Sequence, residues 1–233
     1  MTILRSALFM VWFLFITLVM GVVFLPLLVF PRRWSVLMAR GWAHLVLGGL
    51  WLFCGIGKRV VGVPPGGAAI VASKHMSMWD TLALYLALDD PGIILKESLL
   101  LVPFFGWYVG KTCAIPINRG AGAQALRAMR RAAEAVTGTG RPLLIFPEGT
   151  RKPPGAPPDY KPGVYGLYSL LAVECVPVAL DSGRFWTGFI KRPGVITLQF
   201  LEPIPGTPTL ERRAFMQALE NRIETATNRL LES

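Results

Sequence analysis

The feature of this sequence that most limits its fold is a run of 24 residues without a charged side chain, from Ala7 to Phe30. As a helix, such a run extends roughly 36 Å, enough to cross the ~30 Å hydrocarbon core of a bilayer. Pro26 lies near its end and would kink or end the helix. Arg32, Arg33 and Trp34 follow, a basic and aromatic edge of the kind found at lipid headgroups.

A second apolar stretch, residues 41–57, is 17 residues long and therefore marginal for a membrane span. Two arrangements remain open: a helical hairpin that crosses the bilayer, or two helices that lie within one leaflet. A buried core helix at residues 7–30 is disfavoured, because a helix of this length that is apolar on every side is rare in so small a protein. We therefore expect residues 1–57 to anchor a globular domain formed by residues 58–233.

Composition supports a membrane setting. The chain has 233 residues, of which 53% are hydrophobic and 16% charged, with a net charge of +10. Soluble domains carry about 25% charged residues, so a disordered protein or an ordinary cytosolic enzyme is disfavoured. Residues 1–57 contain four arginines and no acid, which leaves +6 for the rest. An apolar and basic chain predicts contact with anionic lipid, an anionic substrate, or both.

Other classes of protein are excluded by what the sequence lacks. The three cysteines, Cys54, Cys113 and Cys175, are far apart and form no CxxC pair, which disfavours a disulfide framework or a zinc site and fits a cytosol-facing protein. The basic residues are not interleaved with aromatic ones in any nucleic-acid-binding module, so nucleic acid is not an expected partner.

From Lys58 onward, short apolar runs alternate with longer helical patterns, which predicts an α/β domain with a largely buried sheet. Thr209 is the expected cap of a last helix, and the proline-rich residues 152–163 are an expected loop. The expected strands are 69–72, 93–95, 114–117, 143–146, 176–180 and 195–201, and the expected helices between them are 81–88, 121–136 and 165–172.

The first candidate site is His75 with Asp80, five residues later. On one continuous helix these side chains would point about 140° apart, but they can meet if His75 ends a strand or turn and Asp80 lies in the first turn of the next helix. Ser77 and Asp80 have the spacing of a capping box, which indicates a helix start there. Asp80 could then orient His75 as a general base, or it could cap the helix while His75 lies on the surface.

Two further clusters place polar residues after apolar strands. In residues 143–151, LLIFPEGTR, a strand runs into Glu148, Gly149, Thr150 and Arg151, which is either an anion-binding strand end or a turn with a local Glu–Arg pair. In residues 113–120, CAIPINRG, a strand ends on Arg119, and Lys96 follows the strand IIL. Several cations at strand ends, with a possible base beside them, indicate an anionic substrate.

Taken in order, these clusters resemble the glycerolipid acyltransferase family. The H-x4-D block is matched by His75 and Asp80, and the F-P-E-G-T-R block is matched letter for letter at 146–151. An apolar stretch ending on Arg119 and the strand VPVAL, residues 176–180, match the other two blocks. One departure is Lys74, where many members have asparagine; a cation there would favour neutral His75 or bind an anion.

The resemblance implies a mixed sheet wrapped by helices, preceded by a membrane-associated helical pair. It implies transfer of an acyl chain from acyl-CoA or acyl carrier protein to the hydroxyl of 1-acyl-sn-glycerol-3-phosphate, with no metal or cofactor. His75 would be the base and Asp80 its orienting partner. Arg119, Arg151 and Lys96 would bind the acceptor phosphate, while Glu148, Gly149 and Thr150 would shape the acceptor pocket.

Three alternatives remain open at this point: another acceptor such as a lyso-ornithine lipid, a hydrolase, and a lipid-binding scaffold on the same fold. Both substrates of the expected reaction partition into lipid, so the site should lie at the membrane. We expect the protein at the inner membrane of a bacterium, with its catalytic domain facing the cytoplasm.

Overall fold

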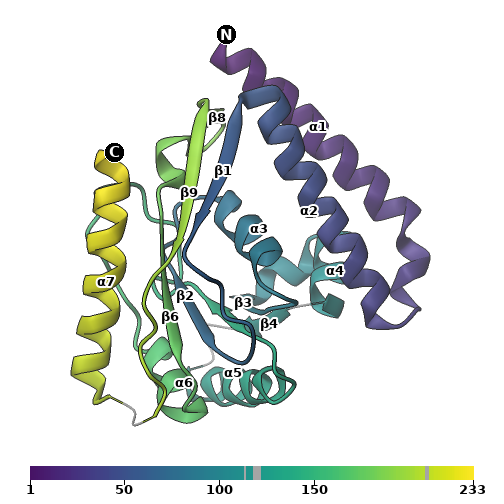
Figure 1. Cartoon of the computed structure of the whole chain (residues 1–233). Coiled ribbons are helices and arrows are strands. Elements are labelled where there is room, and N and C mark those ends of the chain that lie inside the picture. The colour runs from purple at the N-terminus through teal and green to yellow at the C-terminus, as the bar shows by residue number, and fades with distance from the viewer. Residues whose placement is uncertain (113, 118–121, 208–209) are drawn as a thin grey trace.

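Two long helices, α1 (Thr2–Val23) and α2 (Arg32–Cys54), pack along each other at one side of the molecule (Figure 1). They approach closely at Gly49, where an added Cβ would lie 2.2 Å from the ring of Trp12. The indole N–H of Trp12 donates to the Leu45 carbonyl at 3.1 Å. Both helices are long and apolar enough to span a membrane, with mean hydropathies of 2.4 and 1.4.

The structure, a computed structural model, describes residues 1–112, 114–117, 122–207 and 210–233. Beside the helix pair stands a seven-stranded sheet in the order β1-β9-β6-β2-β5-β3-β4. Its neighbouring strands are parallel except for β6 and β9, so the expected mixed sheet is confirmed. The strands are β1 (Ile56–Val61), β2 (Ile70–Ser73), β3 (Gly92–Lys96), β4 (Ala114–Ile117), β5 (Leu143–Ile145), β6 (Cys175–Leu180) and β9 (Gly194–Phe200).

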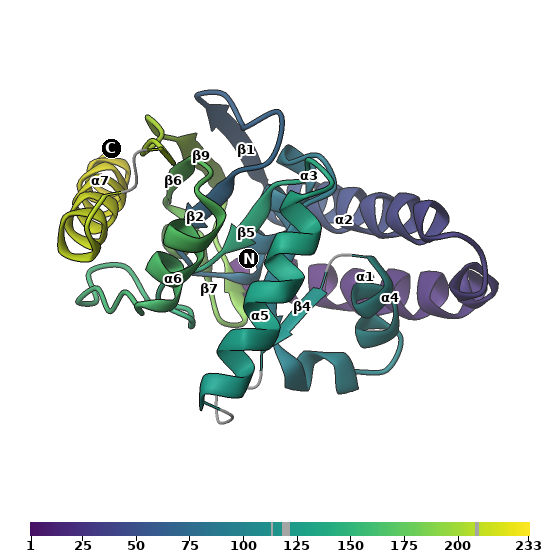
Figure 2. The same ribbon diagram turned by 90° about the horizontal axis from the view of Figure 1, so that it is seen from below.

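Helices cover both faces of this sheet, as Figure 2 shows from below. One face packs against the helix pair and α3, and the other packs against α5, α6 and α7. A short hairpin of β7 (Trp186–Thr187) and β8 (Ile190–Lys191) contacts α1. The remaining elements are α3 (Met78–Ala87), α4 (Phe105–Thr112), α5 (Gly122–Thr137), α6 (Gly163–Leu171), α7 (Arg212–Glu232) and the 3-10 turns Leu25–Leu28, Glu97–Leu101 and Ser182–Arg184.

Alternation along the central strands sends successive side chains to opposite cores. Val71 belongs to the core under the helix pair, whereas Ile70 and Ala72 belong to the core under α7. Leu144 and Leu143 divide in the same way. Because both faces are covered, these strands read in the sequence as continuous apolar runs.

The expected strands and helices are all present, with ends that differ by a few residues. Pro26 follows the end of α1 closely, as expected. Thr209, the expected cap of the last helix, lies outside the described residues, and α7 begins at Arg212.

The sequence analysis did not predict β1, α4 or the hairpin of β7 and β8. Strand β1 lies at the edge of the sheet and buries only its first residue, so it has no alternating pattern to detect. It also begins at Ile56, just before the expected domain boundary. Helix α4 contains two glycines and several aromatic or β-branched residues, which lower its helix propensity.

Candidate active site

The catalytic candidates His75 and Asp80 lie on either side of the start of α3. Strand β2 ends at Ser73, and α3 begins at Met78 with Ser77 as its N-cap. The Ser77 hydroxyl accepts the N–H of Trp79 at 3.2 Å, and Asp80 accepts the N–H of Ser77 at 2.8 Å. The capping box indicated by the sequence is therefore present, and it fixes Asp80 in the first turn.

The two side chains meet: His75 Nδ1 lies 3.0 Å from Asp80 Oδ2. The same oxygen accepts the backbone N–H of Met76 at 2.6 Å, and Asp80 is fully buried. Because these backbone groups can only donate, Asp80 is an acceptor, and the hydrogen-bond network assigns the Nδ1 hydrogen to His75. His75 Nε2 is then left with its lone pair as a proton acceptor. Asp80 therefore caps the helix and orients His75 at the same time.

Ser182 is a site residue that the sequence analysis missed. Its hydroxyl donates to Asp80 Oδ1, which also accepts the Ser77 hydroxyl at 3.1 Å. Ser182 is fully buried and lies just beyond the end of β6, in a 3-10 turn. The two polar residues that follow the buried strand, Asp181 and Ser182, are the signal that could have identified it.

The turn that follows β5 completes the surroundings of His75. The ring of Phe146 stacks on the His75 ring, with centroids 3.9 Å apart. Gly149 has a φ of +66°, in the left-handed region that favours glycine, and its N–H donates to the Phe146 carbonyl at 2.9 Å. The N–H of Lys152 donates to the His75 carbonyl at 2.8 Å. The two motifs are therefore joined by both ring contact and backbone hydrogen bonding.

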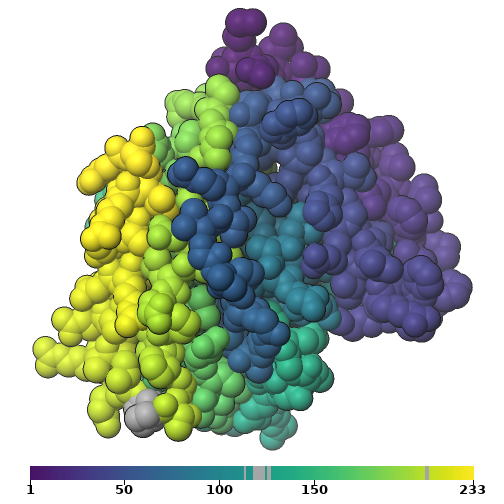
Figure 3. Space-filling model, viewed as in Figure 1, coloured from purple at the N-terminus to yellow at the C-terminus, as the bar shows by residue number. Residues whose placement is uncertain are grey.

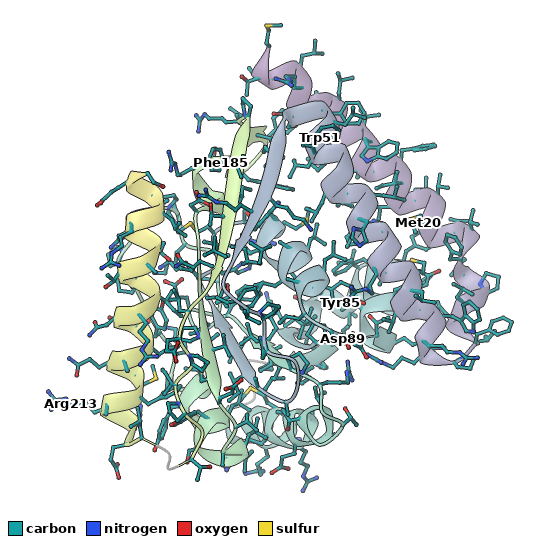
Figure 4. The ribbon with its side chains drawn as sticks, in the orientation of Figure 1. Met20, Trp51, Tyr85, Asp89, Phe185 and Arg213 are labelled. Carbon is teal, nitrogen blue, oxygen red and sulfur yellow. The ribbon has the colours of Figure 1, made fainter. Side chains whose placement is uncertain are left out.

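These residues border a cavity of about 1400 Å³. His75 lines it, and Lys96, Thr150 and Arg151 line it with exposed side chains, next to Gly149. The rest of the wall is largely apolar and reaches the helix pair, where Met20 is labelled in Figure 4. The cavity thus combines cations, a candidate base and a long apolar wall. Arg119, the other expected phosphate ligand, lies outside the described residues.

Glu148 is placed differently from its neighbours in the turn. It is only 3% exposed, and its Oε1 lies 3.1 Å from the ammonium nitrogen of Lys74. In the described part of the chain its ion pair is with Lys74, not with Arg151 as in the local pair that the sequence left open. Burial raises the pKa of Glu148, and the hydrogen bond from Lys74 opposes this shift.

Other candidate groups lie away from the site. His44 is exposed on α2 and does not line the cavity. Cys54 and Cys175 are buried free thiols, whereas Cys113 lies outside the described residues. Among the residues that the structure describes, no three His, Cys, Asp or Glu side chains form a group suited to a metal ion.

The Acyltransferase family model matches residues 59–181, which include His75, Asp80 and the whole 146–151 turn. The chain belongs to the acyltransferase family. This membership confirms the resemblance inferred from the four sequence blocks. The family match ends one residue before Ser182, and it does not include α7.

Three curated relatives are each named as 1-acyl-sn-glycerol-3-phosphate acyltransferases. A 1-acyl-sn-glycerol-3-phosphate acyltransferase from Pseudomonas aeruginosa is 31% identical over 175 residues, which cover 73% of this chain and 68% of that protein. One from Chlamydomonas reinhardtii is 27% identical over 61% of this chain and 44% of its own length. The human beta form is 29% identical over 58% of this chain and 50% of its own.

The fold is that of a solved acyltransferase. The crystal structure of the 1-acyl-sn-glycerophosphate (LPA) acyltransferase from Thermotoga maritima superposes with a TM-score of 0.80 at 21% identity. The match covers 99% of this chain and 98% of the other, so it includes the two N-terminal helices. The expected fold class is therefore confirmed.

Proposed function

We propose that this protein is a membrane-associated 1-acyl-sn-glycerol-3-phosphate O-acyltransferase that forms phosphatidic acid. The observation that carries the proposal is the His75–Asp80 pair at 3.0 Å, which lies in a cavity that contains both cations and a long apolar wall. Family membership and the names of the relatives support the reaction class and the acceptor.

In this mechanism His75 Nε2 takes the proton of the acceptor hydroxyl as the hydroxyl oxygen attacks the thioester carbonyl. A C–O bond forms, the C–S bond breaks, and the proton passes from His75 to the departing thiolate. Asp80 keeps the imidazole oriented and stabilises its transient positive charge. The chemistry needs no metal ion or cofactor.

The acceptor headgroup is assigned to the polar rim of the cavity. Lys96 and Arg151, which line the same cavity as His75, offer an ammonium and a guanidinium to the phosphate. Arg119 is proposed as a third phosphate ligand on the basis of its motif alone. Gly149 and Thr150 border the same rim, and the apolar wall accommodates acyl chain.

Membrane attachment is assigned to the outer face of the helix pair, which forms one side of the molecule in Figure 3. Exposed apolar side chains recur along α1 at spacings of three and four residues, which is one face of a helix. These are Leu4, Leu8, Val11, Phe15, Leu18 and Val22.

Both ends of the helix pair are fastened to the globular part. Near the first end, the N–H of Lys191 in β8 donates to the Ser6 hydroxyl at 2.9 Å. Near the turn of the pair, Arg32 forms an ion pair with Asp90 at 2.6 Å. Helices fastened along the domain in this way favour attachment to one leaflet over a hairpin that crosses the bilayer. A bacterial inner membrane, with the catalytic domain on the cytoplasmic side, remains part of the proposal.

The test of function compares the two histidines of the chain. His75→Ala and His44→Ala are purified in detergent with the wild type and assayed with lysophosphatidate and either acyl-CoA or acyl carrier protein thioesters. The product is read by mass spectrometry. We expect His75→Ala to lose at least about 10³-fold in kcat, because the general base is gone, and His44→Ala to retain wild-type activity. A fully active His75→Ala would refute the proposal.

The choice of acceptor is tested at the rim cations. Lys96→Ala, Arg119→Ala and Arg151→Ala should each raise the KM for lysophosphatidate by about 10-fold or more, since each removes a charged partner of the phosphate. Unchanged kinetics in all three, with better turnover of a phosphate-free lysolipid, would instead assign that lipid as the acceptor. Release of fatty acid without any acceptor would indicate a hydrolase, and absence of thioester consumption would indicate a scaffold.

A further inference from the structure

Behind the candidate site lies a buried ion cluster formed by Lys74, Glu148 and Glu224. The Lys74 ammonium is 3.1 Å from Glu148 Oε1 and 2.8 Å from Glu224 Oε1. The side chains of Lys74 and Glu148 are 3% and 1% exposed, and that of Glu224 is 20% exposed. Lys74 directly precedes His75, and Glu148 belongs to the turn after β5, whereas Glu224 comes from α7.

The residues of the cluster do not line the cavity, although two of them belong to the turns that form its wall. Lys74 reaches Glu224 on α7, whereas His75, the next residue, lines the cavity. The cavity is lined by the residues on both sides of Glu148, namely Pro147 and Gly149, but not by Glu148 itself.

The cluster fastens four segments that are distant in the sequence. The Tyr160 hydroxyl, from the proline-rich loop, donates to Glu224 Oε1 at 2.7 Å. The cluster therefore joins the turn after β2, the turn after β5, the proline-rich loop and α7. A buried ammonium is strongly unfavourable unless it is paired, so Lys74 requires its carboxylate partners.

We propose that Lys74, Glu148 and Glu224 are positioning residues that set the turn after β5 against His75, and that Glu148 acts through Lys74 rather than by touching the acceptor. The proposal rests on the acyltransferase function proposed above. Glu224 lies outside the family match of residues 59–181, so its ion pair with Lys74 joins the matched segment to α7.

Loss of Lys74 would remove the positive charge that holds the two carboxylates together. Without Lys74, Glu148 and Glu224 would face each other as buried or half-buried carboxylates with no ammonium between them. Among the described residues, Glu148 Oε2 has no hydrogen-bond partner, so the carboxylate depends on Oε1 and Lys74. The carboxylates would then move apart and shift Phe146 and Gly149, which belong to the same turn.

The experiment is a double-mutant cycle on the full chain in detergent, with kcat and the acceptor KM measured for Lys74→Asn, Glu224→Gln and the double variant. We expect Lys74→Asn to lower kcat about 10-fold or more with the acceptor KM within about twofold. The double variant should recover most of that loss, because it removes the uncompensated carboxylate together with the cation. Glu220→Gln, one turn earlier on α7, is the matched control and should behave as the wild type.

Glu148→Gln decides between positioning and direct contact. We expect it to lower kcat, to leave the acceptor KM within about twofold, and to add nothing further in a Lys74→Asn background. A raised acceptor KM with unchanged kcat would mean that Glu148 binds the acceptor, which overturns the proposal. A wild-type kcat in Lys74→Asn, or no recovery in the double variant, would overturn it as well.

Glu224→Gln tests the proposal by itself if Lys74→Asn does not fold. We then expect the kcat of Glu224→Gln to be approximately threefold lower than that of Glu220→Gln. Equal kinetics in these two variants would overturn the proposal. The kinetics are measured with whichever acceptor lipid the wild type uses. An inactive wild type toward lysophosphatidate therefore overturns the proposed acceptor, while unchanged kcat in active variants overturns the positioning role.

Discussion

The ring of His75 lies almost parallel to the ring of Phe146, with an interplanar angle of 21° and centroids 3.9 Å apart. The imidazole is therefore held at one edge by Asp80 and on one face by the first residue of the turn after β5. A hydrogen bond at Nδ1 fixes the tautomer, and the stacked ring limits rotation about that bond. Together they direct Nε2 toward the cavity.

Replacing Phe146 should therefore impair catalysis more than binding. We expect Phe146→Leu to lower kcat about 10-fold with little change in KM, because a misdirected base is costly even when substrate still binds. Steady-state kinetics per folded protein provides the measurement. The control is Phe215→Leu, which removes a similar ring stack, with Tyr168 at 4.1 Å, from the core under α7. Equal specific activities in the two variants would contradict a role for the stacking.

Ser182 should contribute to the orientation of Asp80. In Ser182→Ala, the Asp80 Oδ1 atom keeps the Ser77 hydroxyl but loses one of its donors in a buried setting. We expect the free energy of unfolding to fall by about 1–2 kcal/mol and kcat to fall several-fold. Ser35→Ala, which removes a buried hydroxyl bonded to the Leu27 carbonyl in the helix pair, serves as the control. An equal loss of kcat in the control would indicate a purely structural effect.

Asp181 should make stability depend on pH in a defined direction. Burial raises its pKa above the ordinary value of 3.8, against the opposing hydrogen bond from the Thr197 N–H. The folded protein then retains a proton that the unfolded chain releases, so the free energy of unfolding decreases as the pH rises above 3.8 through the folded pKa. Denaturant unfolding at a series of pH values should show Asp181→Asn gaining stability relative to the wild type as the pH rises.

Asp159 provides a control of opposite sign. The hydrogen bond from Lys161 lowers its pKa, so its contribution to stability is present above its ordinary pKa and is lost as the pH falls through the folded pKa. Any loss in the free energy of unfolding of Asp159→Asn, relative to the wild type, should therefore become smaller as the pH falls. A difference between Asp181→Asn and the wild type that is constant, or that grows toward acid pH, would contradict the assignment.

Asp90 should hold the turn between α1 and α2 against the globular domain. Its two oxygens each accept an Arg32 N–H at 2.6 Å, and Arg141 lies 3.1 Å away. Asp90 has a φ of +48°, which asparagine tolerates, so Asp90→Asn removes charge without backbone strain. We expect faster hydrogen exchange in residues 24–31 of this variant than in the wild type. Asp89→Asn changes the exposed neighbour labelled in Figure 4 and should leave exchange there unchanged.

The sequence by itself determined the local parts of this protein. The uncharged run at 7–30 predicted a long apolar helix, and apolar runs between turn signals predicted the central strands. The spacing of Ser77 and Asp80 predicted the helix start, and it allowed the contact of Asp80 with His75 that the structure contains. These predictions succeed because capping and side-chain periodicity depend on residues a few positions apart.

Tertiary structure alone decided which distant groups share a site. Ser182 reaches Asp80 across 102 positions, and Glu224 reaches Lys74 across 150. Neighbours within one motif were also separated, because the turn after β5 buries Glu148 against Lys74 while its flanking residues line the cavity. No local spacing encodes such contacts, since they depend on strand order and on which sheet face each helix covers. The sequence determined that a base and a carboxylate lie close enough along the chain to pair, and the packing of the whole chain decided that they do pair and what surrounds them.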